Sequence, residues 1–274
     1  MHKLLVLLAL GLAGPATAQV LRLPAAPNPP AQVRLLEGWQ AADGSHLVGI
    51  EIRMAPNWYT YWRIPGDAGI PPALDWSGSR NLAGVRHEWP RPTVFDSYGM
   101  TTIGYAGELV LPVVLIPERA DAPIDVSLDL FFGVCDEICI PAEASIEAHI
   151  APGGAGTERA RIEAARADRP RTAAEAGVTA VNCGIAPGPK GPELVANVTF
   201  GAATTPVDLV VIEPGQKGLR IGRTESRSEG AVVSARAPVR STGHGGPAID
   251  REALRLTVIG PGHAVEIEGC RTPG

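Results

Sequence analysis

The fold is decided by residues 124–135, which read IDVSLDLFFGVC. Apolar side chains stand at every second position of this stretch, and Asp125, Ser127 and Asp129 stand between them. A period of two is typical of a β-strand with one buried and one solvent-facing side. We therefore expect a long strand that ends at Cys135, with Cys135 on the more polar side and not locked in the core.

The same alternation recurs in short segments along most of the chain. Pro- and Gly-rich turns separate these segments, and no helical period lies between them. Such a pattern predicts antiparallel β-sandwiches. The alternating segments are 48–54, 109–113, 146–150, 194–200, 207–211 and 254–258.

One segment, 157–177, has a different composition, because Ala, Glu and Arg dominate it. Thr157 is placed to cap a helix, and Thr172 with Glu175 fits a capping box. We predict a short helical linker here. All five Trp and all four Tyr precede residue 106, so the two halves must build different cores. The all-β chain thus divides into a signal peptide at 1–18, a first β-sandwich at 19–152, a linker at 153–177 and a second, smaller β-sandwich at 178–274.

The N-terminus has the layout of a secretory signal peptide. Lys3 is followed by an apolar run at 4–12 and by Ala16-Thr17-Ala18, after which cleavage is expected. No later stretch approaches the roughly 18 to 20 apolar residues that a bilayer requires. The net charge of −5 argues against a nucleic-acid partner. We expect a soluble protein exported to the periplasm, without a transmembrane segment in the mature chain.

Export changes how the four cysteines are interpreted, because disulfides persist in an oxidising compartment. Four cysteines permit three pairings. The spacing favours Cys135 with Cys139, and Cys183 with Cys270. The second bond would join the two ends of a small β-domain, where closing so long a loop is worth on the order of 4 kcal/mol. We predict that it is structural.

The first pair has the features of an exchangeable bond. If residues 136–138 form a hairpin loop, Cys135 and Cys139 face each other across its neck, where Cβ atoms lie about 4.5 to 5.5 Å apart. The bond closes a very small loop and stabilises little, and exposed disulfides are the labile ones. Asp136 and Glu137 disfavour the thiolate, which suits a pair that is attacked by a partner's thiolate.

Several blocks together resemble the N-terminal periplasmic domain of DsbD/ScsB-type thiol:disulfide interchange proteins. The resemblance covers about half the chain, and the three-residue gap between the cysteines is similar to the ScsB-like branch. The blocks are WYTYWRIPGDAGIPP at 58–72, Tyr98-Gly99, Gly104-Tyr105, LVLPV at 109–113 and Cys139-Ile140-Pro141.

The resemblance implies an immunoglobulin-like sandwich whose catalytic residues are Cys135 and Cys139. It implies a relay of electrons from a membrane-embedded DsbD/CcdA-like donor to periplasmic thioredoxin-like proteins, with no cofactor and no metal. A cap loop would shield the cysteines, with Phe95 and Tyr98 as its aromatic residues. The chain has no conduit through the membrane and no C-x-x-C domain. It would therefore act as one component of a protein-disulfide reductase system with separate partners.

Other interpretations remain open at this stage. Two thiols with His87 or His149 would suit Cu(I), and ScsB-like proteins are associated with copper tolerance. Alternatively, both β-domains form a non-catalytic interaction module in which all cysteines are structural. We assign the aromatic block 58–62 to the core and a strand edge, with no catalytic role.

Overall fold

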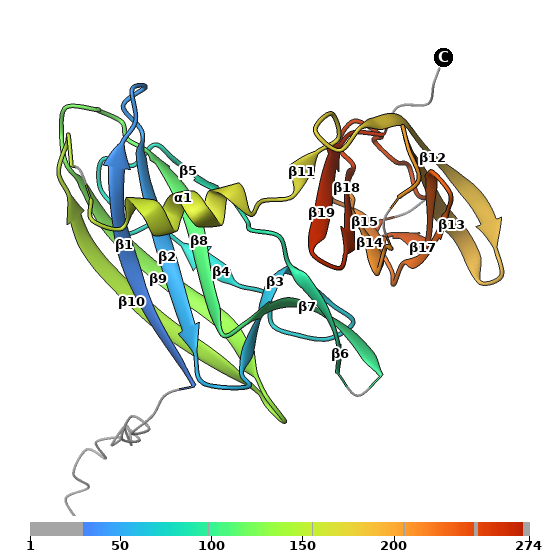
Figure 1. Ribbon diagram of the computed structural model, residues 1–274, viewed down its shortest axis with the longest axis horizontal. Coiled ribbons are helices and arrows are strands. Elements are labelled where there is room, and N and C mark those ends of the chain that lie inside the picture. Colours follow the sequence, from blue (N-terminus) through green and yellow to red (C-terminus); the bar gives the residue numbers. More distant parts are fainter. Residues whose placement is uncertain (1–29, 98, 155, 205, 244–245, 271–274) are drawn as a thin grey trace, which may run out of the picture.

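The computed structural model describes residues 30–97, 99–154, 156–204, 206–243 and 246–270, so the predicted signal peptide lies outside the described residues. Within them the chain forms one helix and many strands (Figure 1), and the all-β prediction is confirmed. The strands of the N-terminal half are β1 (Ala31–Gln40), β2 (His46–Met54), β3 (Tyr59–Gly66), β4 (Ala73–Asp75), β5 (Gly84–His87), β6 (Thr93–Ser97), β7 (Met100–Ala106), β8 (Glu108–Ile116), β9 (Ile124–Cys135) and β10 (Cys139–Ile150).

These strands form two sheets that pack face to face, and we call the pair the N-terminal sandwich. Sheet 1 has the order β1-β2-β8-β5, and sheet 2 has the order β10-β9-β3-β7-β6, with β4 paired to β9. The core between them is rich in aromatic and branched side chains, among them Ile50, Trp62, Val113, Leu128 and Phe132. The even-numbered residues of β9 point into this core, as their alternation predicts.

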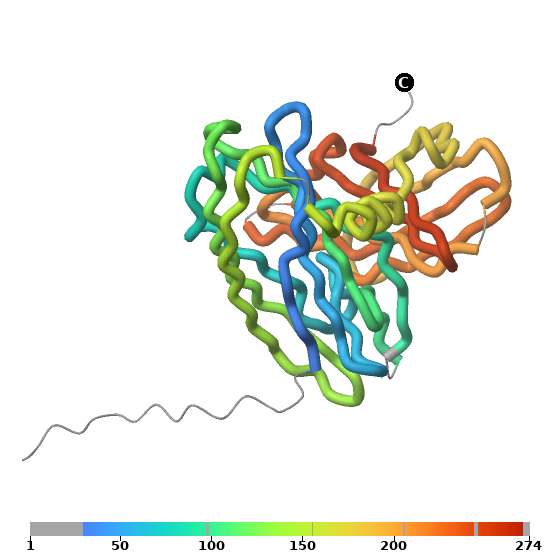
Figure 2. The backbone as a smooth tube through the Cα atoms, turned by 60° about the vertical axis from the view of Figure 1, so that its left-hand side comes forward, coloured from blue at the N-terminus to red at the C-terminus, as the bar shows by residue number. Residues whose placement is uncertain are grey.

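The predicted linker helix is part of the N-terminal sandwich. Helix α1 (Arg159–Ala167) lies across the outer face of sheet 1 (Figures 1 and 2), where Ile162 is fully buried against Leu36, Leu47 and Val114. Gly49 allows this approach, because a Cβ there would lie 3.2 Å from the Ile162 side chain. The prediction that Thr157 caps the helix is wrong: Glu158 is the N-cap residue, and no side chain caps the helix there.

The C-terminal half also consists of two packed sheets, and we call this pair the C-terminal sandwich. Sheet 3 has the order β11-β19-β18-β14, and sheet 4 has the order β12-β13-β17-β15, with β16 paired to β17. The strands are β11 (Arg171–Thr172), β12 (Val178–Gly188), β13 (Gly191–Phe200), β14 (Leu209–Glu213), β15 (Leu219–Ile221), β16 (Glu225–Glu229), β17 (Val232–Ser241), β18 (Arg255–Gly260) and β19 (His263–Glu268). Its apolar core consists of aliphatic side chains and the Cys183–Cys270 disulfide.

The segment between the two sandwiches is not purely helical. β11 lies inside the predicted linker and pairs with β19 in sheet 3. After it, the Thr172 amide donates to the Glu175 carboxylate at 2.8 Å and the Glu175 amide donates to the Thr172 hydroxyl at 3.3 Å, which is the predicted capping box. The exact domain boundaries at 152 and 177 stay a prediction.

The two sandwiches touch each other. Val211 of β14 and Ile259 of β18 are buried in the same apolar cluster as the core of the N-terminal sandwich. The contact is made on the side where β3 ends, and charged residues surround it. The C-terminal sandwich is therefore packed against the element that carries the aromatic block 58–62.

Candidate redox site

The Cys135–Cys139 pair lies at the hairpin between β9 and β10, at the edge of sheet 2. The two strands pair in register from Ile124 to Ile150, so Cys135 and Cys139 are directly opposite each other across a loop of Asp136, Glu137 and Ile138. Their Cα atoms are 4.2 Å apart and their sulfurs are bonded. This is the predicted pairing and the predicted loop. The second predicted pair, Cys183 and Cys270, is bonded as well, with Cα atoms 5.7 Å apart.

The two sulfur-bearing residues differ in exposure. Cys139 is exposed, whereas Cys135 is fully buried. Cys135 lies outside the core cluster, on the more polar side of β9 as expected, but it is fully buried and the accessibility that we expected there is wrong. Cys135 does share a side of β9 with Asp125 and Asp129, but Tyr61 of the adjacent strand β3 covers the end of that side. An incoming group reaches the bond from the Cys139 side.

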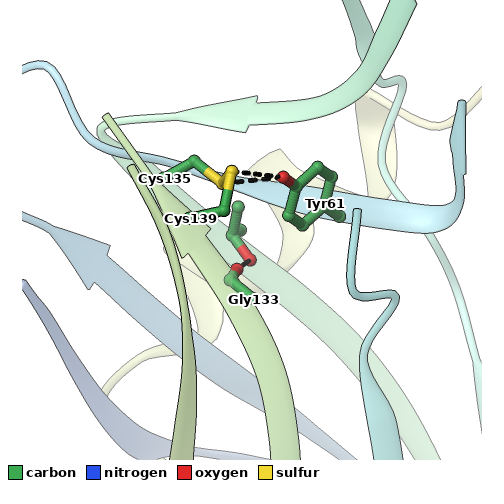
Figure 3. The surroundings of a disulfide bond; sticks show 5 residues. Tyr61, Gly133, Cys135 and Cys139 are labelled. Carbon is green, nitrogen blue, oxygen red and sulfur yellow. Dashed lines mark hydrogen bonds between the residues drawn. A yellow bond between two sulfur atoms is a disulfide. The ribbon is translucent and has the colours of Figure 1, made fainter. Parts of the chain in front are cut away.

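The side chain of Tyr61 contacts the disulfide (Figure 3). Its hydroxyl lies 2.7 Å from Cys135 Sγ and 3.1 Å from Cys139 Sγ. Because bonded sulfurs carry no proton, the hydroxyl is the donor in both contacts. Tyr61 is 2% exposed. Burial, with a smaller contribution from Tyr59, raises the pKa of Tyr61 to about 12. The hydroxyl therefore keeps its proton, and remains a donor, over the whole physiological pH range.

The position of the Tyr61 ring depends on two glycines. A Cβ at Gly133 would lie 2.8 Å from the ring, and a Cβ at Gly69 would lie 2.3 Å from it. The backbone around the ring is also fixed, since the Thr60 hydroxyl donates to the Gly133 carbonyl at 2.8 Å and the Gly133 amide donates to the Ile70 carbonyl at 3.1 Å. The ring is thus enclosed between β9 and the segment that follows β3.

The sequence interpretation missed Tyr61, because it assigned the block 58–62 to the core and a strand edge. The assignment is right for Trp62, which is fully buried in the core. Tyr59 and Tyr61 lie on the opposite side of β3 from Trp62, and their rings meet edge to face with centroids 5.9 Å apart. The period-two spacing of these two tyrosines was the signal that could have separated them from the core residues.

The predicted cap residues are only partly described. Phe95 lies on β6, and its ring packs on the Tyr59 ring with centroids 5.7 Å apart. Tyr59 in turn pairs with Cys135 across β3 and β9. Phe95 thus belongs to a row of aromatic rings that leads to the disulfide. Tyr98 lies outside the described residues.

The surface at the disulfide combines acidic and apolar side chains. Asp136 and Glu137 are exposed, and Ile138 between them and Cys139 is 68% exposed. Ile138 directly precedes Cys139 at the start of β10.

The histidines of the copper hypothesis lie elsewhere. His149 is bonded to Asp125 at 2.7 Å and stands ten residues along β10 from Cys139, about 33 Å at the usual rise per residue. His87 accepts a hydrogen bond from the Trp76 indole at 3.3 Å. Within the described ranges, no three His, Cys, Asp or Glu side chains are grouped as metal ligands.

Residues 32–151 match the protein family described as "Thiol:disulfide interchange protein DsbD, N-terminal". The solved N-terminal periplasmic domain of ScsB from Proteus mirabilis is similar over 92% of this chain and 97% of its own, with 21% identity and a TM-score of 0.69. The N-terminal domain of Neisseria meningitidis DsbD in the reduced form has 23% identity over 44% of this chain and 86% of its own, with a TM-score of 0.25. No curated protein matches. The likeness to the ScsB domain shows that the fold is shared across both sandwiches.

Proposed function

We propose, from the DsbD/ScsB-type N-terminal domain that residues 32–151 form, that this chain relays electrons by thiol–disulfide exchange through Cys135 and Cys139. The electrons would come from a membrane-embedded reductase of the DsbD/CcdA-like type and pass to periplasmic thioredoxin-like proteins. Within the part of the chain that the structure describes, no helix is long and apolar enough to span a bilayer.

The observation that carries the proposal is the unequal exposure of the two cysteines. A thiolate of the donor attacks the exposed Cys139 sulfur, a bond forms between donor and Cys139, and the Cys135–Cys139 bond breaks. The electron pair of the broken bond stays on Cys135, which leaves as a thiolate. Tyr61 supports this step, since its hydroxyl is 2.7 Å from the Cys135 sulfur and hydrogen bonds to charged acceptors are about twice as strong as neutral ones.

Two further exchanges complete the transfer of electrons from the donor to the acceptor. A second donor thiolate attacks the donor sulfur of the mixed disulfide, which oxidises the donor to a disulfide and releases Cys139 as a thiolate. The reduced pair then transfers its two electrons in the same manner, with Cys139 attacking a disulfide of the acceptor protein and Cys135 resolving the new mixed disulfide. The acceptor leaves as a dithiol, and Cys135–Cys139 is bonded again.

The cap loop is the third part of the proposal. A reduced pair at a loop tip would be oxidised by any small oxidant in the compartment, and an aromatic cover would slow this reaction. Phe95 supports the idea through its contact with Tyr59, which pairs with Cys135. The family resemblance supports Tyr98 as the second cap residue.

Trapping of mixed disulfides tests the proposal. We expect Cys135→Ala, which leaves the exposed Cys139 alone, to accumulate mixed disulfides with thioredoxin-like and membrane reductase partners in periplasmic extracts. Cys139→Ala leaves the buried Cys135 and is the matched control, with little or no trapping expected. The complexes are detected by non-reducing electrophoresis and mass spectrometry. If neither variant captures a redox partner while both remain folded, the relay function is wrong.

A further inference from the structure

Arg63 links the strand that carries Tyr61 to the C-terminal sandwich. It stands two residues after Tyr61 on β3, and its guanidinium group donates to Glu213 of β14 at 2.8 and 3.1 Å and to Glu266 of β19 at 2.5 Å. The side chains of Arg63 and Glu213 are each 16% exposed, and that of Glu266 is 27% exposed. The Arg63 guanidinium also lies 4.1 Å from the centre of the buried Trp62 ring. Two carboxylates and the Trp62 ring thus hold the Arg63 guanidinium group in one position.

A second contact from the same sandwich holds the segment that follows β3. Arg223 pairs with Asp67 at 3.2 Å and donates to the Thr101 hydroxyl at 3.2 Å. Asp67 in turn accepts from the Thr101 amide at 2.8 Å. Two residues further on, Gly69 lies against the Tyr61 ring. The C-terminal sandwich therefore holds the chain on both sides of the turn that encloses this ring.

An open pocket of about 330 Å³ lies between the end of β3 and strand β14, and Ile64, Asp67, Ile103, Val211 and Arg223 line it. Beside this pocket, Val211 and Ile259 pack against the core of the N-terminal sandwich. The apolar packing and the ion pairs of Arg63 and Arg223 therefore position the end of β3 together.

We propose that Arg63 is a positioning residue for the redox pair, and that the C-terminal sandwich serves to hold β3 so that the Tyr61 hydroxyl stays on both sulfurs. The inference deepens the proposed function, on which it rests, and gives the second sandwich a role in it. Hydrogen bonds weaken steeply with distance and angle. A shift of β3 by a fraction of an ångström would therefore weaken the donation to the sulfurs.

The experiment measures the reduced pair without any partner protein. In the full chain, the Cys135–Cys139 bond is opened with mild reductant, and the alkylation rate of Cys139 by iodoacetamide is followed from pH 5 to pH 10. Tyr61→Phe removes the donor, so we expect a higher apparent thiol pKa and a roughly tenfold lower rate near pH 7. Asp136 and Glu137, which lie in the loop between the two cysteines, and Tyr59, which interacts with Tyr61, are unchanged in all variants.

Arg63→Gln should lower the rate in the same direction, by about three- to tenfold. In the Tyr61→Phe background it should change the rate by less than twofold, because the group through which it acts is gone. Arg223→Gln serves as a second variant and should lower the rate in the same direction, since Arg223 is 63% exposed and its partner Asp67 keeps the hydrogen bond from the Thr101 amide. Arg80→Gln is the matched control: Arg80 is 80% exposed, pairs with Asp125 at the far end of β9, and should leave the rate unchanged.

Two outcomes would overturn the inference. One is an effect of Arg63→Gln that is as large in the Tyr61→Phe background as in the wild type. The other is a wild-type alkylation profile in Arg63→Gln and Arg223→Gln while circular dichroism shows both folded. Because the readout contains no partner, a failure here is distinguishable from a failure of the trapping experiment, which tests the relay itself.

Discussion

At the residue scale, the packing at the end of β9 gives Cys135 and Cys139 different exposures to solvent. Tyr61 covers Cys135 and leaves Cys139 in contact with solvent. The difference assigns an order to exchange: the exposed sulfur is attacked, and the buried one leaves toward a hydrogen-bond donor. A neutral hydrogen bond contributes about 1 kcal/mol, and one to a thiolate about twice that. The Tyr61 hydrogen bond thus contributes more free energy after the Cys135–Cys139 bond has opened than before.

The aromatic cover gives a prediction at the same scale. Phe95→Ala removes the ring that packs on Tyr59, so we expect faster oxidation of the reduced pair by a small disulfide reagent, by about three- to tenfold. The rate is measured by stopped-flow with the full chain. Phe131→Ala is the matched control, because Phe131 is a 40% exposed aromatic residue of the same sheet. An unchanged oxidation rate in folded Phe95→Ala would contradict the shielding role and leave the relay proposal standing.

The sequence alone predicts the cysteine pair of this site, but not the tyrosine that contacts it. The spacing of Cys135 and Cys139 at the end of an alternating run was sufficient to predict the hairpin and its bond. The burial of Cys135 was missed, because alternation within one strand says nothing about which neighbouring strand covers its end. Tyr61 was missed for a related reason: it reaches Cys135 across 74 positions of sequence, through the pairing of β3 with β9. Such long-range contacts are set by topology.

At the element scale, the helix expected to be a linker is fixed by charge as well as by apolar packing. Glu51 of β2 is 3% exposed and pairs with Arg161 of α1, with Arg34 and with Arg53. Arg161 also reaches Glu108 at 2.6 Å. Burial alone would raise the pKa of Glu51, but the hydrogen bonds and charges of Arg34 and Arg161 lower it to about 2. The composition of residues 157–177 predicted a helix and gave no information about this anchor.

The low pKa of Glu51 gives a prediction with a defined sign. The carboxylate stabilises the folded state above its ordinary pKa of 4.5, and this contribution is lost as the pH falls from 4.5 toward 2. We expect Glu51→Gln to lower the free energy of unfolding by about 2 kcal/mol at pH 7, less than for a fully buried pair because the arginines are partly exposed. Urea titrations from pH 7 to pH 2 measure it. A difference between wild type and variant that persists unchanged at pH 2 would contradict the assignment.

At the scale of the whole molecule, the two sandwiches are stabilised differently. The N-terminal sandwich has a core that contains aromatic side chains, whereas the C-terminal one has a core of aliphatic residues joined by Cys183–Cys270. The uneven distribution of Trp and Tyr predicted this contrast from sequence. The contact between the sandwiches was not predictable, because Arg63 and its partners Glu213 and Glu266 belong to no local pattern. Their pairing depends on how the two halves are placed.

Removal of the second disulfide is expected to affect only stability. Cys183→Ala with Cys270→Ala opens a loop with a sequence separation of 87, so we expect the free energy of unfolding of the C-terminal sandwich to fall by about 2–4 kcal/mol. Far-ultraviolet circular dichroism detects this transition. Tryptophan fluorescence reports on the N-terminal sandwich, which holds all five Trp, and serves as the internal control. A changed equilibrium of Cys135–Cys139 with glutathione would contradict a purely structural role for this bond.

The joint between α1 and β11 limits how far the two sandwiches can separate. Only residues 168–170 lie between these docked elements, which is about 10 Å of fully extended chain. Asp168 is itself held by Arg91, at 2.7 Å through the backbone and 3.1 Å through the side chain. Domains joined by a long flexible linker can adopt many relative orientations, so a partner protein can bind one domain without contacting the other. Here the joint is short and Asp168 is anchored, so the two sandwiches can change their relative orientation only over a small range.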